Sequence, residues 1–123
     1  MASEHEEQAA LIKWFDLQHK HLRGRLFAIP NGGQRHILVA SKLKAEGVRK
    51  GLPDLMLPVK NRDYCGLFIE MKAKKGKATV EQLDWIDYLN DAGYFALVCY
   101  GIDDAKMAIL NYLANDFKIK ETL

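Results

Sequence analysis

Two short motifs carry the residues of this sequence that are best suited to chemistry. Asp54 follows a proline at the start of one apolar run, and Glu70 and Lys72 lie two residues apart in the next run. Residues two apart on a strand point to the same face, so pairing of the two runs brings both carboxylates and the ammonium together. Hard oxygen ligands suit Mg²⁺ or Mn²⁺, and an adjacent ammonium can hold a water or offset charge on a phosphate. The pattern is typical of a metal-dependent phosphodiesterase.

The same residues also have a purely structural interpretation. A Pro-Asp pair commonly opens a turn, and a Glu-x-Lys pair on an exposed strand face is usually a solvated ion pair. The rest of the sequence therefore has to distinguish a catalytic site from an ordinary turn and an ordinary surface strand.

Length and composition indicate one folded unit. A chain of 123 residues is long enough to bury a core and too short for two typical domains, so we expect a single domain over residues 1–123. No secretory signal or membrane span is recognisable. Cys65 and Cys99 lack metal-ligand spacing, so we expect two reduced thiols in a cytoplasmic protein.

Positive charge is concentrated in the middle of the chain. Residues 18–77 contain fourteen Lys or Arg against four Asp or Glu, a net charge of +10, whereas the flanks carry −3 and −5. Such a segment suits a polyanionic substrate such as DNA, although Lys and Arg are also ordinary surface residues. The basic candidates for DNA contact are Arg35, Lys42, Lys44, Arg49, Lys50, Lys74, Lys75 and Lys77.

Apolar periodicity predicts the order αβαββαβα, which is an α/β sandwich with a mixed sheet flanked by helices. We expect helices near 4–22, 35–46, 79–91 and 104–113, and strands near 25–29, 54–59, 66–73 and 94–100. The almost wholly apolar strand 94–100 suits a central position with both faces covered.

Local signals set the expected helix boundaries. Ser3 with Glu6, and Thr79 with Gln82, have the spacing of capping boxes at the starts of two helices. Asp103 is the expected cap of the last helix. In the helix that begins after Thr79, the apolar residues expected to point inward are Leu83, Ile86 and Leu89.

With this order in place, the chain resembles the PD-(D/E)xK nuclease superfamily and is most similar to the VRR-NUC domain. The likeness extends over about residues 4–115. Besides the two acidic motifs, it is carried by Asn31-Gly32-Gly33 with Arg35, Gly47 before a basic turn, the run Gly51-Leu52-Pro53-Asp54-Leu55, and Gln82. The resemblance implies a restriction-endonuclease-like core and adds Asn31 to the residues expected near DNA.

The resemblance also implies roles for individual residues. Asp54, Glu70 and the main-chain carbonyl of Met71 would bind Mg²⁺, for which Mn²⁺ can substitute, and Lys72 would orient or activate the attacking water. Glu7, from the first helix, would complete the acidic cluster around the metal. Gln82 would support the lysine or the scissile phosphate. These residues are the expected catalytic set.

Two of these residues have structural alternatives. Glu7 lies in the first turn of its helix, where an acid is favoured by the positive end of the helix dipole. Gln82 occupies the last position of a capping box, so its amide has a structural task whether or not it assists catalysis.

Free-standing minimal domains that resemble this one are dimeric junction resolvases in the family. The resemblance therefore implies a homodimer that cleaves four-way (Holliday) junctions in DNA repair or recombination. Alternatives are a flap or fork nuclease, a restriction-like endonuclease, and a non-catalytic DNA-binding module. Two apolar helices could form the dimer interface; their residues are Ile37, Leu38, Val39 and Leu43 in one, and Met107, Ala108, Ile109, Leu110, Tyr112 and Leu113 in the other.

Overall fold

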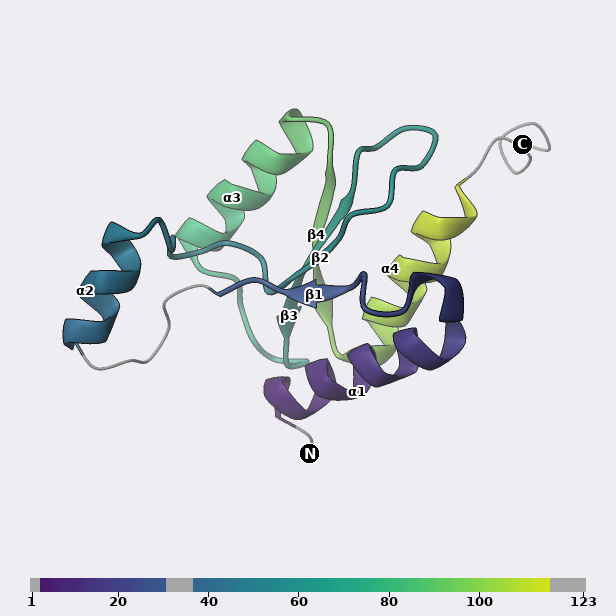
Figure 1. Cartoon of the computed structure of the whole chain (residues 1–123), viewed down its shortest axis with the longest axis horizontal. Coiled ribbons are helices and arrows are strands. Elements are labelled where there is room, and N and C mark those ends of the chain that lie inside the picture. Colours follow the sequence, from purple (N-terminus) through teal and green to yellow (C-terminus); the bar gives the residue numbers. More distant parts are fainter. Residues whose placement is uncertain (1–2, 31–36, 116–123) are drawn as a thin grey trace.

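A mixed sheet forms the centre of the molecule and carries helices on both faces (Figure 1). The computed structural model describes residues 3–30 and 37–115. Within these ranges the strands are β1 (Phe27–Ala28), β2 (Leu55–Leu57), β3 (Leu67–Lys72) and β4 (Phe95–Tyr100), in the order β1-β2-β3-β4. β2 pairs antiparallel with β1 and β3, whereas β3 and β4 are parallel. The α/β fold predicted from the sequence is confirmed.

Three of the α-helices cover the two faces of the sheet. The helices are α1 (Glu4–Gln18), the 3₁₀ helix η1 (Lys20–Leu22), α2 (Ile37–Ala45), α3 (Val80–Asp91) and α4 (Ile102–Ala114). α1 and α4 pack on one face, and α3 packs on the other. In the described ranges no helix is long and apolar enough to cross a membrane.

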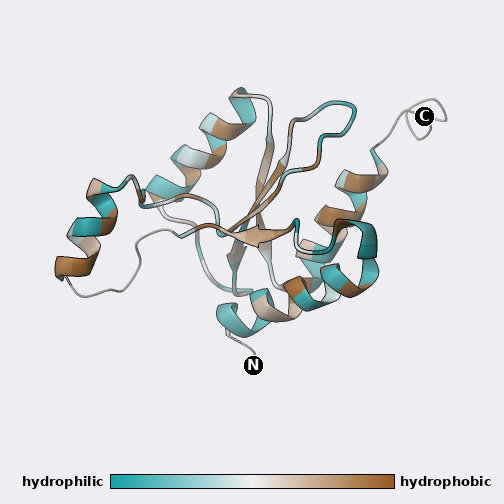
Figure 2. Ribbon diagram, in the orientation of Figure 1, coloured by the Kyte–Doolittle hydropathy of each residue, from teal (hydrophilic) through white to brown (hydrophobic). Residues whose placement is uncertain are grey.

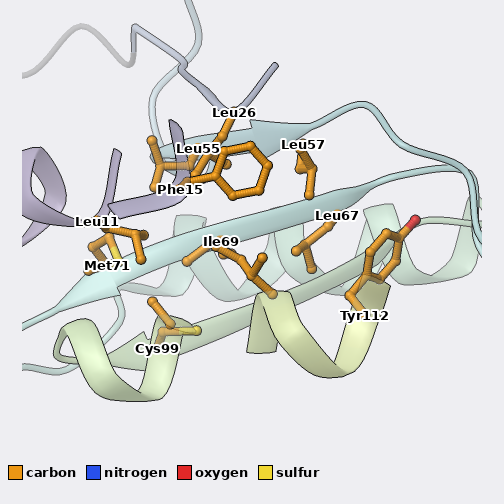
Figure 3. Packing of buried hydrophobic residues seen from close by; sticks show 12 residues of the cluster. Leu11, Phe15, Leu26, Leu55, Leu57, Leu67, Ile69, Met71, Cys99 and Tyr112 are labelled. Carbon is orange, nitrogen blue, oxygen red and sulfur yellow. The ribbon is translucent and has the colours of Figure 1, made fainter. Parts of the chain in front are cut away.

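Side-chain alternation along β3 separates a core face from a chemical face. Leu67, Ile69 and Met71 point into the main core with α1 and α4, as Figure 3 shows. Phe68 points to the other face, where it packs with α3. Because Glu70 follows Phe68 by two residues, its carboxylate lies on the α3 face. β3, an inner strand of the sheet, therefore presents Glu70 to the first turn of α3.

The first helix is shorter than its apolar pattern predicted. Its capping box is present: Ser3 Oγ accepts from the Glu6 amide, and the Glu6 carboxylate accepts from the Ser3 amide. The helix ends at Gln18 rather than near Leu22, because His19 leaves helical geometry with its ring 5.0 Å from that of Phe15. η1 follows directly, with His19 as its N-cap residue.

The inward stripe of α3 begins at Gln82 rather than at Leu83. Ile86 and Leu89 are buried as predicted, but Leu83 is 48% exposed, so its inward assignment was wrong. Gln82, Ile86 and Leu89 follow the i, i+4, i+7 spacing of one helix face. The first inward position of α3 is therefore polar. Its residue, Gln82, forms a hydrogen bond with Glu70 of the sheet.

Two expectations near the C-terminal end also need correction. β4 is an edge strand of the sheet in the described ranges, not a central one, and it reads as wholly apolar because α3 and α4 cover its two faces. The last helix is capped by Gly101, with φ +91°, rather than by Asp103. The side chain that closes this turn is that of Asp104, which accepts from the Tyr100 amide at 2.8 Å.

Candidate active site

Asp54 is held in place by the strands on both sides of it. Its carbonyl accepts a hydrogen bond from the Ile29 amide of the β1 segment at 2.8 Å. Its carboxylate oxygen Oδ2 accepts from the Met71 amide of β3, also at 2.8 Å. Leu55 pairs with Ile69, so the antiparallel register continues with Asp54 opposite Glu70. At Met71, the next residue of β3, the hydrogen-bond acceptor is the Asp54 side chain rather than a backbone carbonyl of β2.

The Glu70 carboxylate is the most deeply buried charged group in the described ranges, with 2% of the residue exposed. Its Oε2 lies 3.0 Å from the donating Gln82 Nε2 and 3.5 Å from Lys72 Nζ. Its other oxygen, Oε1, is buried and receives no hydrogen bond from the described residues. A buried oxygen without a donor is costly unless a proton or a cation satisfies it.

Burial is the main reason why the pKa values of Asp54 and Glu70 are both raised. At Glu70 the negative charge of Asp54 adds to this effect, and the pKa is raised to about 8. The Met71 amide opposes the rise at Asp54, and Lys72 opposes it at Glu70. Without a cation, Glu70 therefore holds a proton near neutral pH.

Metal-free protein should consequently lose stability as the pH rises. Unfolded Glu70 loses its proton near pH 4.5, whereas folded Glu70 keeps it up to about pH 8. The stability linked to this proton is therefore complete below pH 4.5 and is lost as the pH rises through 8. Glu70→Gln keeps a neutral group at all pH values. We expect it to be more stable than the wild type at pH 8.5, by roughly 2–4 kcal/mol.

Chemical denaturation in the presence of a chelator checks this expectation at pH 5 and pH 8.5. The two proteins should differ little at pH 5 and clearly at pH 8.5. A difference in the free energy of unfolding that stays constant between these pH values would contradict the raised pKa of Glu70.

The donor set of this site fits a small divalent cation. Asp54 and Glu70 supply hard oxygen ligands, and Glu70 Oε1 is a buried acceptor that still needs a positive partner. The N–H and C=O of one strand residue point to the same side. Because the Met71 amide points to Asp54, the Met71 carbonyl is directed to that side as well. Two carboxylates and one carbonyl are therefore available at the end of β3 where Asp54 meets it.

A third acid is not brought into this group in the part of the chain that the structure describes. No cluster of three or more His, Cys, Asp or Glu suited to a metal is found there. Glu7 is half-buried, and a methyl group added at Gly101 would lie 3.4 Å from its Oε2. The Gly101 amide donates to the Lys72 carbonyl, so Glu7 lies at the same end of β3 as the site.

A second acid of the first helix, Glu4, was not among the site residues expected from the sequence. Glu4 lies one turn before Glu7, and its negative charge contributes to the raised pKa of Asp54. The spacing i, i+3 places both acids on one side of α1, and this signal was available in the sequence. The N-terminal turn of α1 therefore presents two carboxylates toward the end of the sheet that carries Asp54.

Gln82 joins the start of α3 to the site. The side-chain Oε1 of Gln82 accepts from the backbone N–H of Thr79 at 2.8 Å. The backbone N–H of Gln82 donates to Thr79 Oγ1 at 3.2 Å, which completes the predicted capping box. Its Nε2 donates to Glu70 Oε2. The side-chain hydrogen bond toward the site thus goes to Glu70, whereas the sequence analysis expected Lys72 or the phosphate.

Close packing of Gly51 sets the approach of the Pro53-Asp54 turn to α3. Gly51 has φ +92°, and a Cβ at this position would lie 2.8 Å from Glu81 Cβ and 2.9 Å from its backbone carbon. Glu81 also forms an ion pair of 3.5 Å with Lys50. The turn can therefore lie against the first turn of α3 only because residue 51 has no side chain.

Gly51→Ala should destabilise the fold by roughly 1–3 kcal/mol, through both the left-handed φ and the clash with α3. Gly47 is a matched control, since it has φ +99° and open space around its missing Cβ. Gly47→Ala carries the conformational penalty alone. Equal shifts in the midpoint of urea denaturation for the two variants would show that the contact with Glu81 does not matter.

The candidate DNA-binding residues lie at exposed positions near both motifs. Arg49 and Lys50 precede the Pro53-Asp54 turn, and Lys74, Lys75 and Lys77 follow the end of β3. Lys42 and Lys44 are exposed on α2. Asn31 and Arg35 lie outside the described residues.

The fold and the site together define a class of protein. A mixed sheet that brings a Pro-Asp carboxylate beside a Glu-x-Lys strand is the arrangement of the PD-(D/E)xK nucleases. Comparison with protein families gives a match to the VRR-NUC domain over residues 2–103. The chain belongs to the VRR-NUC family, whose domains are nucleases of this kind, and DNA is its substrate class.

A solved structure supports the same assignment. The chain is similar to a "VRR_NUC domain protein", with a TM-score of 0.84 and 30% sequence identity, over 94% of this chain and 92% of the other. A search of curated protein sequences found no match. The expected fold and family are thus confirmed, and the chain is an α/β nuclease domain.

Proposed function

We propose that this protein is a Mg²⁺-dependent, structure-selective DNA endonuclease that acts on branched DNA, as a homodimer that resolves Holliday junctions in DNA repair or recombination. The observation that carries the catalytic part is the buried Glu70 carboxylate. One of its oxygens is held by Gln82 and Lys72, and the other receives no hydrogen bond from residues 3–30 and 37–115, beside a second carboxylate at Asp54.

In this proposal Asp54, Glu70 and the Met71 carbonyl hold the cation, and Mn²⁺ can take the place of Mg²⁺. When bound, the cation supplies a positive charge on a non-bridging phosphate oxygen and lowers the pKa of a water. Glu7 lies at the same end of the sheet and assists from the edge of the site.

The remaining groups orient what the cation holds. The Lys72 side chain is largely shielded from solvent at 13% exposure, and its Nζ lies 3.5 Å from Glu70 Oε2. An ammonium in this position can hold the attacking water or offset charge on the phosphate. Gln82 keeps Glu70 Oε2 in place, which leaves Oε1 for the cation.

Exposed basic residues on both sides of the site provide the surface for DNA. We expect Lys74→Ala combined with Lys75→Ala to weaken DNA binding and to reduce the slope of log affinity against log salt by up to about two units. Fluorescence anisotropy at several salt concentrations measures both quantities. An unchanged affinity and slope would mean that DNA contacts another surface.

The preference for four-way junctions follows from symmetry. A Holliday junction has two equivalent scissile strands, and two active sites related by a two-fold axis match them. A flap has one scissile position and needs one site. The small size of the domain leaves little material for reading bases, which argues against a restriction-like enzyme.

The test is a panel of labelled DNA substrates, namely single strand, duplex, flap, fork and four-way junction, each with and without Mg²⁺. Symmetric nicking of the four-way junction is the expected result. Faster cleavage of flaps by a monomer would instead favour a flap or fork nuclease. Absence of cleavage with tight DNA binding would favour a non-catalytic module.

Two broader parts of the proposal concern the whole chain. We expect residues 1–123 to act as one nuclease domain, consistent with the likeness over 94% of the chain. A DNA substrate and two free cysteines, Cys65 and Cys99, are compatible with work in the cytoplasm.

A further inference from the structure

α2 lies at the periphery of the part of the molecule that the structure describes. Figure 1 shows it at one end of the molecule, on the left of the view. α2 is not among the elements that pack closely on one another in residues 3–30 and 37–115. Leu38 is 67% exposed and Val39 is 44% exposed, and Figure 2 shows the apolar start of this helix.

A helix of this length needs tertiary contacts to persist. Isolated helices shorter than about 12–15 residues are marginal in water, and α2 has nine residues. The contacts that stabilise it must therefore come from a surface that can cover Leu38 and Val39. The helix carries Lys42 and Lys44 and no acid, so this surface should be both apolar and negative.

The outer face of α3 has both properties. α3 carries Glu81, Asp84, Asp87 and Asp91 and no basic residue. Val80, Leu83 and Tyr88 are its exposed apolar side chains. The negative charge makes this face unsuitable for a DNA backbone, although it adjoins the active site through Gln82.

A shallow cavity lies on the same face. Asp84, Trp85 and Tyr88 line a volume of about 190 Å³. The rings of Trp85 and Tyr88 meet edge to face with centroids 5.7 Å apart. An aromatic pair beside a carboxylate suits the aliphatic stem and the ammonium of a lysine.

We propose that α2 of each subunit packs on the outer face of α3 of a second copy of this chain. The two contacts are equivalent by a two-fold axis, as an isologous dimer requires. Leu38 and Val39 would cover the apolar residues of α3, and Lys42 would face Asp84 and Asp87. This inference rests on the homodimer of the proposed function and names its interface.

α4 is a weaker candidate for the same role. Ile109 and Tyr112 belong to the core, and only Met107 and Leu110 of its large apolar residues are substantially exposed. α4 also packs on α1 and β4, so it needs no further partner to be stable.

A charge exchange tests the interface. The first variant combines Lys42→Glu with Lys44→Glu, and the second combines Asp84→Lys with Asp87→Lys. Alone, each variant sets like charges against each other in both contacts of its dimer. In an equal mixture, the heterodimer has opposite charges at both contacts. Lys13→Glu with Lys20→Glu is the matched control, since both lysines are exposed on the first helical segment.

Light scattering measures the mass of each sample. One of the two variants carries a fusion partner, so that a heterodimer differs in mass from either homodimer. We expect wild type and control to have the mass of two chains, each variant alone the mass of one, and the mixture the mass of a heterodimer. Variants that remain dimeric would place the interface elsewhere and overturn the inference. Monomeric variants that stay monomeric when mixed would overturn it too, because opposite charges on α2 and α3 of different subunits would then fail to restore the dimer.

A cross-link covers the case in which a charge variant does not fold. In a Cys65→Ser background, Lys42→Cys and Asp84→Cys subunits of different size are mixed and oxidised. A disulfide between the two sizes supports the interface, and its absence in a dimeric sample overturns it. Loss of DNA affinity in the lysine variant without any change of mass would assign α2 to DNA. Cleavage by the wild type is measured separately, so a failed interface does not count against the nuclease.

Discussion

Replacing Asp54, Glu70 or Lys72 by alanine is expected to abolish DNA cleavage and to leave the fold intact. Loss of a metal ligand or of a group that orients the attacking water typically costs about 10²-fold or more in rate. The three side chains lie within one connected group, in which Met71 links Asp54 to β3 and Glu70 contacts Lys72. Single-turnover cleavage with saturating enzyme measures the loss, and circular dichroism measures the fold.

The neighbouring residues provide graded controls. Glu7→Ala should be slower than the wild type but active, because Glu7 lies at the edge of the site. Gln82→Ala should be milder still in its direct effect on the rate, although it removes one hydrogen bond to Glu70. Asp103→Ala changes an exposed acid on α4 and should cut normally. Wild-type cleavage by folded Asp54→Ala would show that the assigned site is wrong.

Removal of divalent cations is expected to stop cleavage completely. In the metal-free protein, Glu70 holds a proton because burial and Asp54 raise its pKa to about 8. The site then lacks the positive charge of a cation, which phosphodiester hydrolysis needs. Mg²⁺ or Mn²⁺ should restore cleavage. Ca²⁺ should support DNA binding without cleavage, since its longer bonds and looser geometry do not align water and phosphate.

Cleavage and binding assays in parallel separate these effects. Chelator-treated protein is supplied with each cation in turn, and junction binding is followed by anisotropy while nicking is followed on gels. The Lys74→Ala, Lys75→Ala variant serves as a control that loses binding without a change in cation preference. Cleavage that survives in excess chelator would rule out the metal-dependent mechanism.

Local features of the chain were readable from the sequence because they depend on neighbours a few residues apart. Both capping boxes form as predicted, at Ser3 and at Thr79. The period of two in residues 67–72 predicted that Glu70 and Lys72 share a face, and their contact agrees with this. The order of elements, together with the two acidic motifs, was sufficient to recognise the family.

Features that depend on how elements are rotated and ordered needed the tertiary structure. A small rotation of α3 about its axis decides whether Leu83 or Gln82 points to the sheet, and the sequence of the helix is compatible with both orientations. An apolar strand looks central whether it is covered by strands at its edges or by helices on its faces, so the edge position of β4 was not predictable.

The sequence by itself determined which residue types could do chemistry and on which strands they lie, because side-chain alternation and capping are local. Only the tertiary structure decided that Glu70 is buried with one oxygen that receives no hydrogen bond from the described residues, and that the Asp54 side chain takes the place of a backbone partner of β3. Burial and register arise from contacts between distant parts of the chain, and these contacts set the charge state of the site. The peripheral position of α2 has the same origin, since the exposure of Leu38 and Val39 in the described part of the chain depends on where the rest of the fold lies.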